Sequence, residues 1–276
     1  MNLDKDIRES IAAGSFYPQN PGVLRSQINE FLDNAELLNI KNIKALVCPH
    51  AGYIYSGQVA AYSYKQIIGR KFDCIFIIAP SHAEYFDFIS IYSGKAYKTP
   101  LGLVNIDIER SKILASQNPN IKLSLYGHRN EHSLEVQLPF LQVALENIKI
   151  VPIVIGQQNK QNIEELGNTI GSLFKDDNIL IIASTDLSHY HPYDIAVSLD
   201  KKVQQLIENY DTETLQAEFL DNSIEMCGGG PVASSMIAAK ILGADSSKIL
   251  CYQNSGDVTG DRSAVVGYLS AVFYKT

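Results

Sequence analysis

Cys74-Ile75-Phe76-Ile77-Ile78-Ala79-Pro80-Ser81-His82 is a short apolar run that leads directly into a histidine. Two other runs have the same form, from Lys44 to His50 and from Ile179 to His189. Short continuous apolar runs are typical of strands buried on both faces of an α/β sheet. Ligands bind such sheets just beyond the carboxyl ends of the strands. The sequence therefore predicts that three histidines lie at the edge where open α/β folds build their sites.

The pattern along the chain alternates between strands and helices, which predicts an α/β fold. We expect a three-layer sandwich, with a central mixed, mostly parallel sheet flanked by helices. The expected strands are 44–49, 74–80, 89–92, 149–155, 179–183, 249–253 and 264–273. The expected helices are about 21–38, 55–68, 163–174, 194–208 and 232–242, a segment near 131–145 bent at Pro139, and a helix following a short strand or turn within 105–116.

The composition bounds the class of protein. The chain has 276 residues, 46% of them hydrophobic, which is enough for one α/β domain over 1–276. The net charge of −7 argues against a dedicated nucleic-acid binder or a basic membrane-surface patch. No apolar run is long enough for a membrane span, and the first residues lack the layout of a signal peptide, so we expect a cytoplasmic protein.

Histidine and cysteine residues form the candidate metal site. His50 and His82 each sit on a turn rich in small residues or proline, and neutral imidazole is the commonest side-chain metal ligand. Cys227 is the candidate third ligand, because it precedes Gly228-Gly229-Gly230 at the start of an expected helix, where a thiolate is favoured. The alternative is that Cys227 is an ordinary loop cysteine beside a tight glycine turn.

Two further histidines are candidates for proton transfer. His132 follows Glu131 at the start of a helix, and the alternative is a simple helix-start pair. Asp186 precedes His189 by three residues, so its carboxylate is expected to orient that imidazole, unless it only caps a helical turn. We expect His128 and His191 at the surface.

Several motifs together resemble the Memo family, also called AmmeMemoRadiSam system protein B. The longest are Pro49-His50-Ala51-Gly52-Tyr53-Ile54-Tyr55-Ser56-Gly57 and Glu131-His132-Ser133-Leu134-Glu135-Val136-Gln137-Leu138-Pro139-Phe140. Three shorter ones are Ala13-Gly14-Ser15-Phe16-Tyr17-Pro18, Pro80-Ser81-His82 and Ser184-Thr185-Asp186-Leu187-Ser188-His189-Tyr190. Phe16 and Thr185 depart from the family's usual Trp and Ser.

The resemblance implies a fold like that of the class III extradiol dioxygenases, which bind non-haem iron(II). By this resemblance His50, His82 and Cys227 would be the metal ligands, with Cys227 in place of a carboxylate. His132 and His189 would be acid/base residues, accompanied by Asp186. Iron(II) is the metal that the resemblance favours, and zinc or copper would also suit these ligands. The exchange of carboxylate for thiolate means that the fold does not fix the reaction.

Three functions remain open at this point. The first is an iron-dependent oxidoreductase of unknown substrate, and the second is a zinc hydrolase with the same ligands. The third is a non-catalytic module that uses the pocket for a peptide or a protein partner. The family name also implies radical-SAM and AMMECR-type protein partners.

Overall fold

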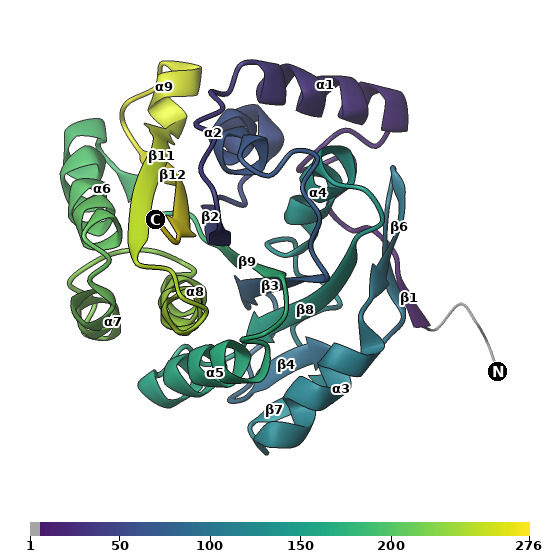
Figure 1. The fold of residues 1–276 in the computed structure, drawn as a ribbon. Helices are drawn as coiled ribbons and strands as arrows, with labels where there is room; N and C mark the ends of the chain where they lie inside the picture. The colour runs from purple at the N-terminus through teal and green to yellow at the C-terminus, as the bar shows by residue number, and fades with distance from the viewer. Residues whose placement is uncertain (1–5) are drawn as a thin grey trace.

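The computed structural model describes residues 6–276. Strands from both ends of this range and from between them join one central sheet (Figure 1). Its strand order is β1-β5-β6-β8-β3-β9-β2-β12-β10, with β11 added beside β12, β4 beside β8, and β7 beside β4. The strands are β1 (Ile7–Arg8), β2 (Ile43–Cys48), β3 (Cys74–Pro80), β4 (Ile89–Tyr92), β5 (Ala96–Thr99), β6 (Gly102–Ile106), β7 (Ile121–Ser124), β8 (Lys149–Ile155), β9 (Ile179–Ser184), β10 (His189–His191), β11 (Ser246–Asn254) and β12 (Val265–Tyr274).

The middle of the sheet is parallel and buried on both faces. β2 pairs with β9, β9 with β3, and β3 with β8, all in parallel. Side chains alternate along each strand, so Phe76 and Ile78 of β3 enter one core while Ile75 and Ile77 enter the other. This double burial explains why these strands are continuous apolar runs, and it confirms the predicted sandwich with a mixed, mostly parallel sheet.

Helices cover both faces of the sheet (Figure 1). The helices are α1 (Pro21–Asp33), α2 (Tyr53–Lys65), α3 (Ile108–Gln117), α4 (Leu138–Ala144), α5 (Lys160–Leu173), α6 (Tyr193–Glu208), α7 (Thr212–Leu220), α8 (Gly229–Ile241) and α9 (Ser255–Thr259). α1, α2 and α4 supply residues to one core, and α3, α5, α6, α7 and α8 supply residues to the other. The sheet is therefore packed between two hydrophobic cores, and this packing holds the ends of its strands in place.

Some boundaries differ from the predicted ones. The expected helix over 21–38 ends at Asp33. The segment near 131–145 becomes a 3-10 turn at Glu135–Gln137 followed by α4, with Pro139 in the first turn, where a missing N–H costs nothing. The third apolar run ends as a strand at Ser184, so His189 is not a strand-end residue. It begins β10 and pairs antiparallel with β12.

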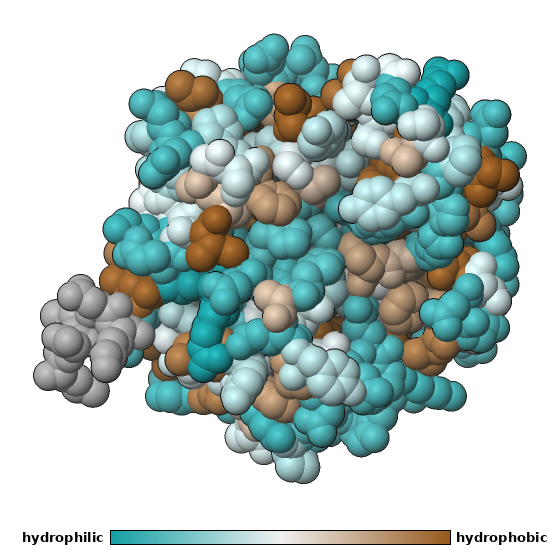
Figure 2. Space-filling model, turned by 180° about the vertical axis from the view of Figure 1, so that it is seen from behind, coloured by the Kyte–Doolittle hydropathy of each residue, from teal (hydrophilic) through white to brown (hydrophobic). Residues whose placement is uncertain are grey.

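Within residues 6–276, no helix is both long and apolar enough to cross a bilayer. The face shown in Figure 2 mixes hydrophilic side chains with scattered hydrophobic ones. This mixture is ordinary for a folded domain, because apolar atoms always form much of a protein's surface.

Candidate metal centre

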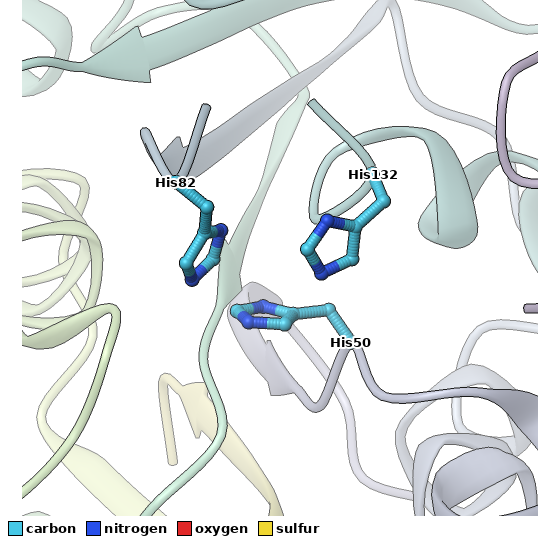
Figure 3. Close-up of side chains that lie close together, drawn as sticks. All are labelled: His50, His82 and His132. Atoms are coloured by element: carbon cyan, nitrogen blue, oxygen red, sulfur yellow. The ribbon is translucent and has the colours of Figure 1, made fainter. Parts of the chain in front are cut away.

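Three imidazoles from distant parts of the chain point into one shared space (Figure 3). His50 follows β2, His82 follows β3, and His132 precedes the turn that opens α4. One nitrogen from each ring lies within 4.8 Å of the others, and the ring centroids are 5.0–5.6 Å apart. The three side chains could therefore hold a metal ion at the carboxyl edge of the sheet, where the sequence predicts the site.

Hydrogen bonds behind His50 fix which nitrogen faces the centre. Nδ1 lies 2.9 Å from the Ser184 hydroxyl oxygen, and that hydroxyl donates its own proton to the Ser133 carbonyl at 2.7 Å. The hydroxyl must then accept from Nδ1–H, which leaves Nε2 with a bare lone pair. Burial lowers the pKa of His50 well below its usual value, so the ring is neutral. A neutral ring with Nε2 free is the form that binds metals.

His82 is held by a buried carboxylate. Its Nδ1 lies 2.9 Å from Oε1 of Glu131, and its backbone N–H donates to Oε2 of the same side chain. Burial alone would raise the pKa of Glu131, but the hydrogen bonds and charge of His82 outweigh it and lower the pKa to about 2. Because Nδ1–H is engaged by a carboxylate, Nε2 of His82 is the nitrogen left for a ligand.

His132 is held in the cluster by stacking between two other rings. Its ring stacks on His82, with centroids 5.0 Å apart, and on Phe16, with centroids 4.3 Å apart. Nδ1 of His132 lies 3.4 Å from Oε1 of Glu131. Burial lowers the pKa of His132, so this ring too is favoured in its neutral form. Phe16 supplies the aromatic face against which the His132 ring packs.

Cys227 lies against His50, beside the three-histidine group. Its Sγ is 3.1 Å from Nε2 of His50 and accepts the backbone N–H of Asp186 at 3.1 Å. Burial raises the pKa of the thiol, with the Asp186 carboxylate adding to the shift. Burial of the thiol thus opposes the thiolate form that the start of this helix would favour. The sulfur nevertheless stands beside the nitrogen that faces the centre.

The glycines after Cys227 allow close packing. A Cβ on Gly228 would lie 2.2 Å from the Ser184 carbonyl oxygen, and one on Gly229 would lie 2.1 Å from the Phe219 ring. The backbone therefore approaches the end of β9 more closely than a side chain would permit. This approach places Cys227 next to the loop that follows β9.

Asp186 serves His50 more directly than His189. Its Oδ1 accepts the backbone N–H of His50 at 2.8 Å, and its Oδ2 lies 3.8 Å from Nε2 of His50. Burial raises the pKa of Asp186 to about 7. Among the residues that the structure describes, no hydrogen bond joins Asp186 to His189. The predicted orientation of His189 by Asp186 is absent from this arrangement, although His189 lies near enough to His82 for their charges to interact.

The sequence as a whole matches one family. The family model described as Memo-like protein matches residues 8–272. The chain belongs to the Memo family. A MEMO1 family protein of Nitrosopumilus maritimus is 37% identical, with 95% of this chain and 98% of the relative covered. One from Aquifex aeolicus is 40% identical, with 97% and 99% covered, and one from Methanothermobacter thermautotrophicus is 36% identical, with 95% and 98% covered.

Among solved structures, the fold is similar to that of the uncharacterized protein JW3007 from Escherichia coli K12. The TM-score is 0.54 at 13% sequence identity, covering 83% of this chain and 99% of that one. At this identity the likeness concerns the fold alone. Membership of the Memo family accounts for the ordered motifs found along the chain.

Two site features of this Memo-family chain were not predicted from sequence. Glu131 supports His82 as well as lying beside His132, and Ser184 supports His50. Both residues flank a predicted site residue or strand end, but their partners are far away in the sequence.

His128 was expected at the surface and is instead 1% exposed, with Nδ1 2.8 Å from the Tyr97 hydroxyl. His191 is partly exposed and pairs with Glu225 at 2.8 Å.

Proposed function

We propose that this Memo-family chain is an iron(II)-dependent oxidoreductase in which His50, His82 and Cys227 bind the metal. The observation that carries the proposal is the 3.1 Å separation between Sγ of Cys227 and Nε2 of His50. A nitrogen and a sulfur bound to one ion at about 2.1 and 2.3 Å, at right angles, lie roughly 3.1 Å apart. The His50–Cys227 pair therefore fits one transition-metal ion without a large movement of either side chain, whereas the donor atoms that all lie within 4.8 Å of one another are those of His50, His82 and His132.

Hydrogen-bond partners behind His50 and His82 orient the two rings for metal binding. Ser184 and Glu131 occupy the Nδ1 atoms of His50 and His82, so each ring is left with Nε2 for a further partner, and that of His50 faces Sγ of Cys227. Such outer partners fix the ring orientation and raise the basicity of the ligand nitrogen. When bound, iron(II) would supply a centre for redox chemistry with open positions for a substrate.

His132 and His189 are the side chains proposed to move protons. Burial lowers the pKa of both rings, so each is favoured as a neutral base. His132 stacks on the His82 ring, and His189, at the start of β10, lies near enough to His82 for their charges to interact. A neutral imidazole near the reacting groups accepts a proton and returns it later, which is the usual role of histidine in general acid/base catalysis.

A zinc hydrolase is the second candidate, and the His50-His82-His132 group favours it. Three histidines around one ion, with a fourth position open, form a known class of catalytic zinc site. In that case His132 would be a ligand and Cys227 a neighbour. The two candidates therefore differ in which residue completes the pair of His50 and His82.

Metal uptake by matched variants separates the candidates. The chain, Cys227→Ser and His132→Gln are loaded anaerobically with iron(II) or zinc, and the bound metal per chain is measured. The proposal expects one iron per chain, a large loss in Cys227→Ser and retention in His132→Gln. Oxygen consumption and generic ester hydrolysis are then assayed on the loaded protein. Loss of zinc in His132→Gln alone, together with ester hydrolysis, would instead establish the hydrolase.

A further inference from the structure

A hollow of about 320 Å³ lies beside the metal centre, and three tyrosines line it. Tyr55 comes from the first turn of α2, Tyr190 from β10, and Tyr268 from β12. The volume is at the lower end of the range for small-molecule sites. Neither the hydrophobic cores nor the candidate metal centre explains why three tyrosines line this hollow.

The hollow borders the metal centre because the same segments build both. Tyr55 follows the His50 turn, and Tyr190 directly follows His189, with ring centroids 5.8 Å apart. Tyr268 is close enough to Asp186 for that carboxylate to help raise its pKa, after burial, which is the largest cause. A ligand in the hollow would therefore have one end near the candidate ligands.

The conformation of Tyr190 is unusual for a structural residue. Its φ is +62°, in the left-handed region that non-glycine residues rarely adopt, and its side chain is 76% exposed. Tyr55 is also exposed, at 40%. Large aromatic rings held at a cavity without being buried are not needed for the core, and backbone strain of this kind gathers at ligand sites.

The charges around the hollow select the type of ligand. Asp261 lines it, and hydrogen bonds from Ser263 lower the pKa of Asp261, so the carboxylate is negative at neutral pH. Of the described residues that line the hollow, none is a lysine, arginine or histidine. The nearby Arg262 stacks on Tyr193, 4.2 Å from the ring centroid. Aromatic rings and a carboxylate that line one hollow together attract a cation.

We propose that the hollow lined by Tyr55, Tyr190, Tyr268 and Asp261 binds a small organic cation, such as an ammonium or a methylated ammonium group. The cation is held by the tyrosine faces and the carboxylate. This binding does not depend on a metal ion, so it goes beyond the proposed function and is tested separately from it.

Choline and its neutral carbon isostere 3,3-dimethylbutan-1-ol are the probes for this site. Both are titrated into the metal-free chain and followed by NMR or calorimetry. We expect saturable binding of choline and about two- to fivefold weaker binding of the isostere, because only choline gains the cation–π attraction of exposed rings. Tyr190→Leu and Asp261→Asn should each weaken choline binding several-fold, while Tyr190→Phe, which keeps the ring, should retain it.

Tyr85→Leu is the matched control, since Tyr85 is 86% exposed and does not line the hollow. Equal binding of choline and the isostere would overturn the proposal. So would an equal loss in Tyr85→Leu and Tyr190→Leu, or the absence of saturable choline binding below about 10 mM. A chain that binds choline but takes up no metal would retain this inference and refute the proposed metal function.

Discussion

Nδ1 of His82 lies 2.9 Å from Oε1 of Glu131, and Glu131 is almost completely buried. His82 itself is at the rim, with 36% of its side chain exposed. The buried carboxylate therefore holds an exposed imidazole in one orientation. The orientation of His82 for metal binding therefore depends on Glu131.

Replacing Glu131 by Gln should weaken metal binding about 10- to 100-fold, because the ligand loses its charged outer partner. Competition with a coloured chelator measures the affinity. Glu225→Gln is the control, because it alters a similar pair, His191 and Glu225 at 2.8 Å, outside the three-histidine group. Equal losses in both variants would show that Glu131 has no special role.

Replacing Glu135 by Gln should destabilise the fold strongly. Glu135 is fully buried and accepts hydrogen bonds from Arg8, Ser10, Tyr17 and the backbone of Ile11 and Ala12. Removing one charge of a buried pair leaves the other uncompensated, at a cost of about 3–5 kcal/mol. Urea unfolding measures the loss.

Glu9→Gln provides the comparison for Glu135, since the Lys98–Glu9 pair is exposed. We expect a change of about 0–1 kcal/mol there. A Glu135→Gln protein as stable as Glu9→Gln would refute the assigned role of the buried pair.

His128 should make the fold sensitive to acid. Burial lowers its pKa to about 3, whereas an unfolded histidine titrates near about 6.5. The unfolded chain therefore binds more protons below that value. The contribution of His128 to the free energy of unfolding is therefore most favourable above about pH 6.5. It decreases as the pH falls, by about 2 kcal/mol at pH 5.

Urea midpoints at pH 7 and pH 5 test this dependence in His128→Gln, which keeps a neutral donor and acceptor. We expect a smaller difference between the two pH values than in the parent chain. An unaltered difference in His128→Gln would contradict the prediction.

Gly228→Ala should displace the Cys227 loop. The added Cβ would lie 2.2 Å from the Ser184 carbonyl oxygen, a backbone atom that cannot easily move. We expect a loss of a few kcal/mol in unfolding free energy, as for other overpacked sites, together with weaker metal uptake. Gly22→Ala, whose nearest contact is 3.3 Å from an Asn20 side-chain oxygen, should retain both properties.

The strands of the core could be predicted because burial on both faces leaves a direct trace in the sequence. The 149–155 run became β8 with the same bounds, and 74–80 became β3. Short edge strands such as β1 and β7 leave no such trace, since pairing rather than composition defines them. The five-residue helix α9 is absent from the predicted helices for a similar reason, because a helix this short, held by a local capping box, leaves no periodic pattern.

The candidate site was only partly predictable. His50 and His82 were found because each directly follows a core strand, and the structure brings them together. His132 was predicted near them, but its closeness to both rings depends on the turn before α4. The support of His82 by Glu131 and of His50 by Ser184 joins residues 49 and 134 positions apart, which no local pattern reveals.

X-ray absorption at the iron edge of the anaerobically loaded chain tests the central claim most directly. The account predicts one sulfur at about 2.3 Å in the parent chain and its disappearance in Cys227→Ser, with histidine nitrogens remaining in both. A shell containing only nitrogen and oxygen in the parent chain would contradict it.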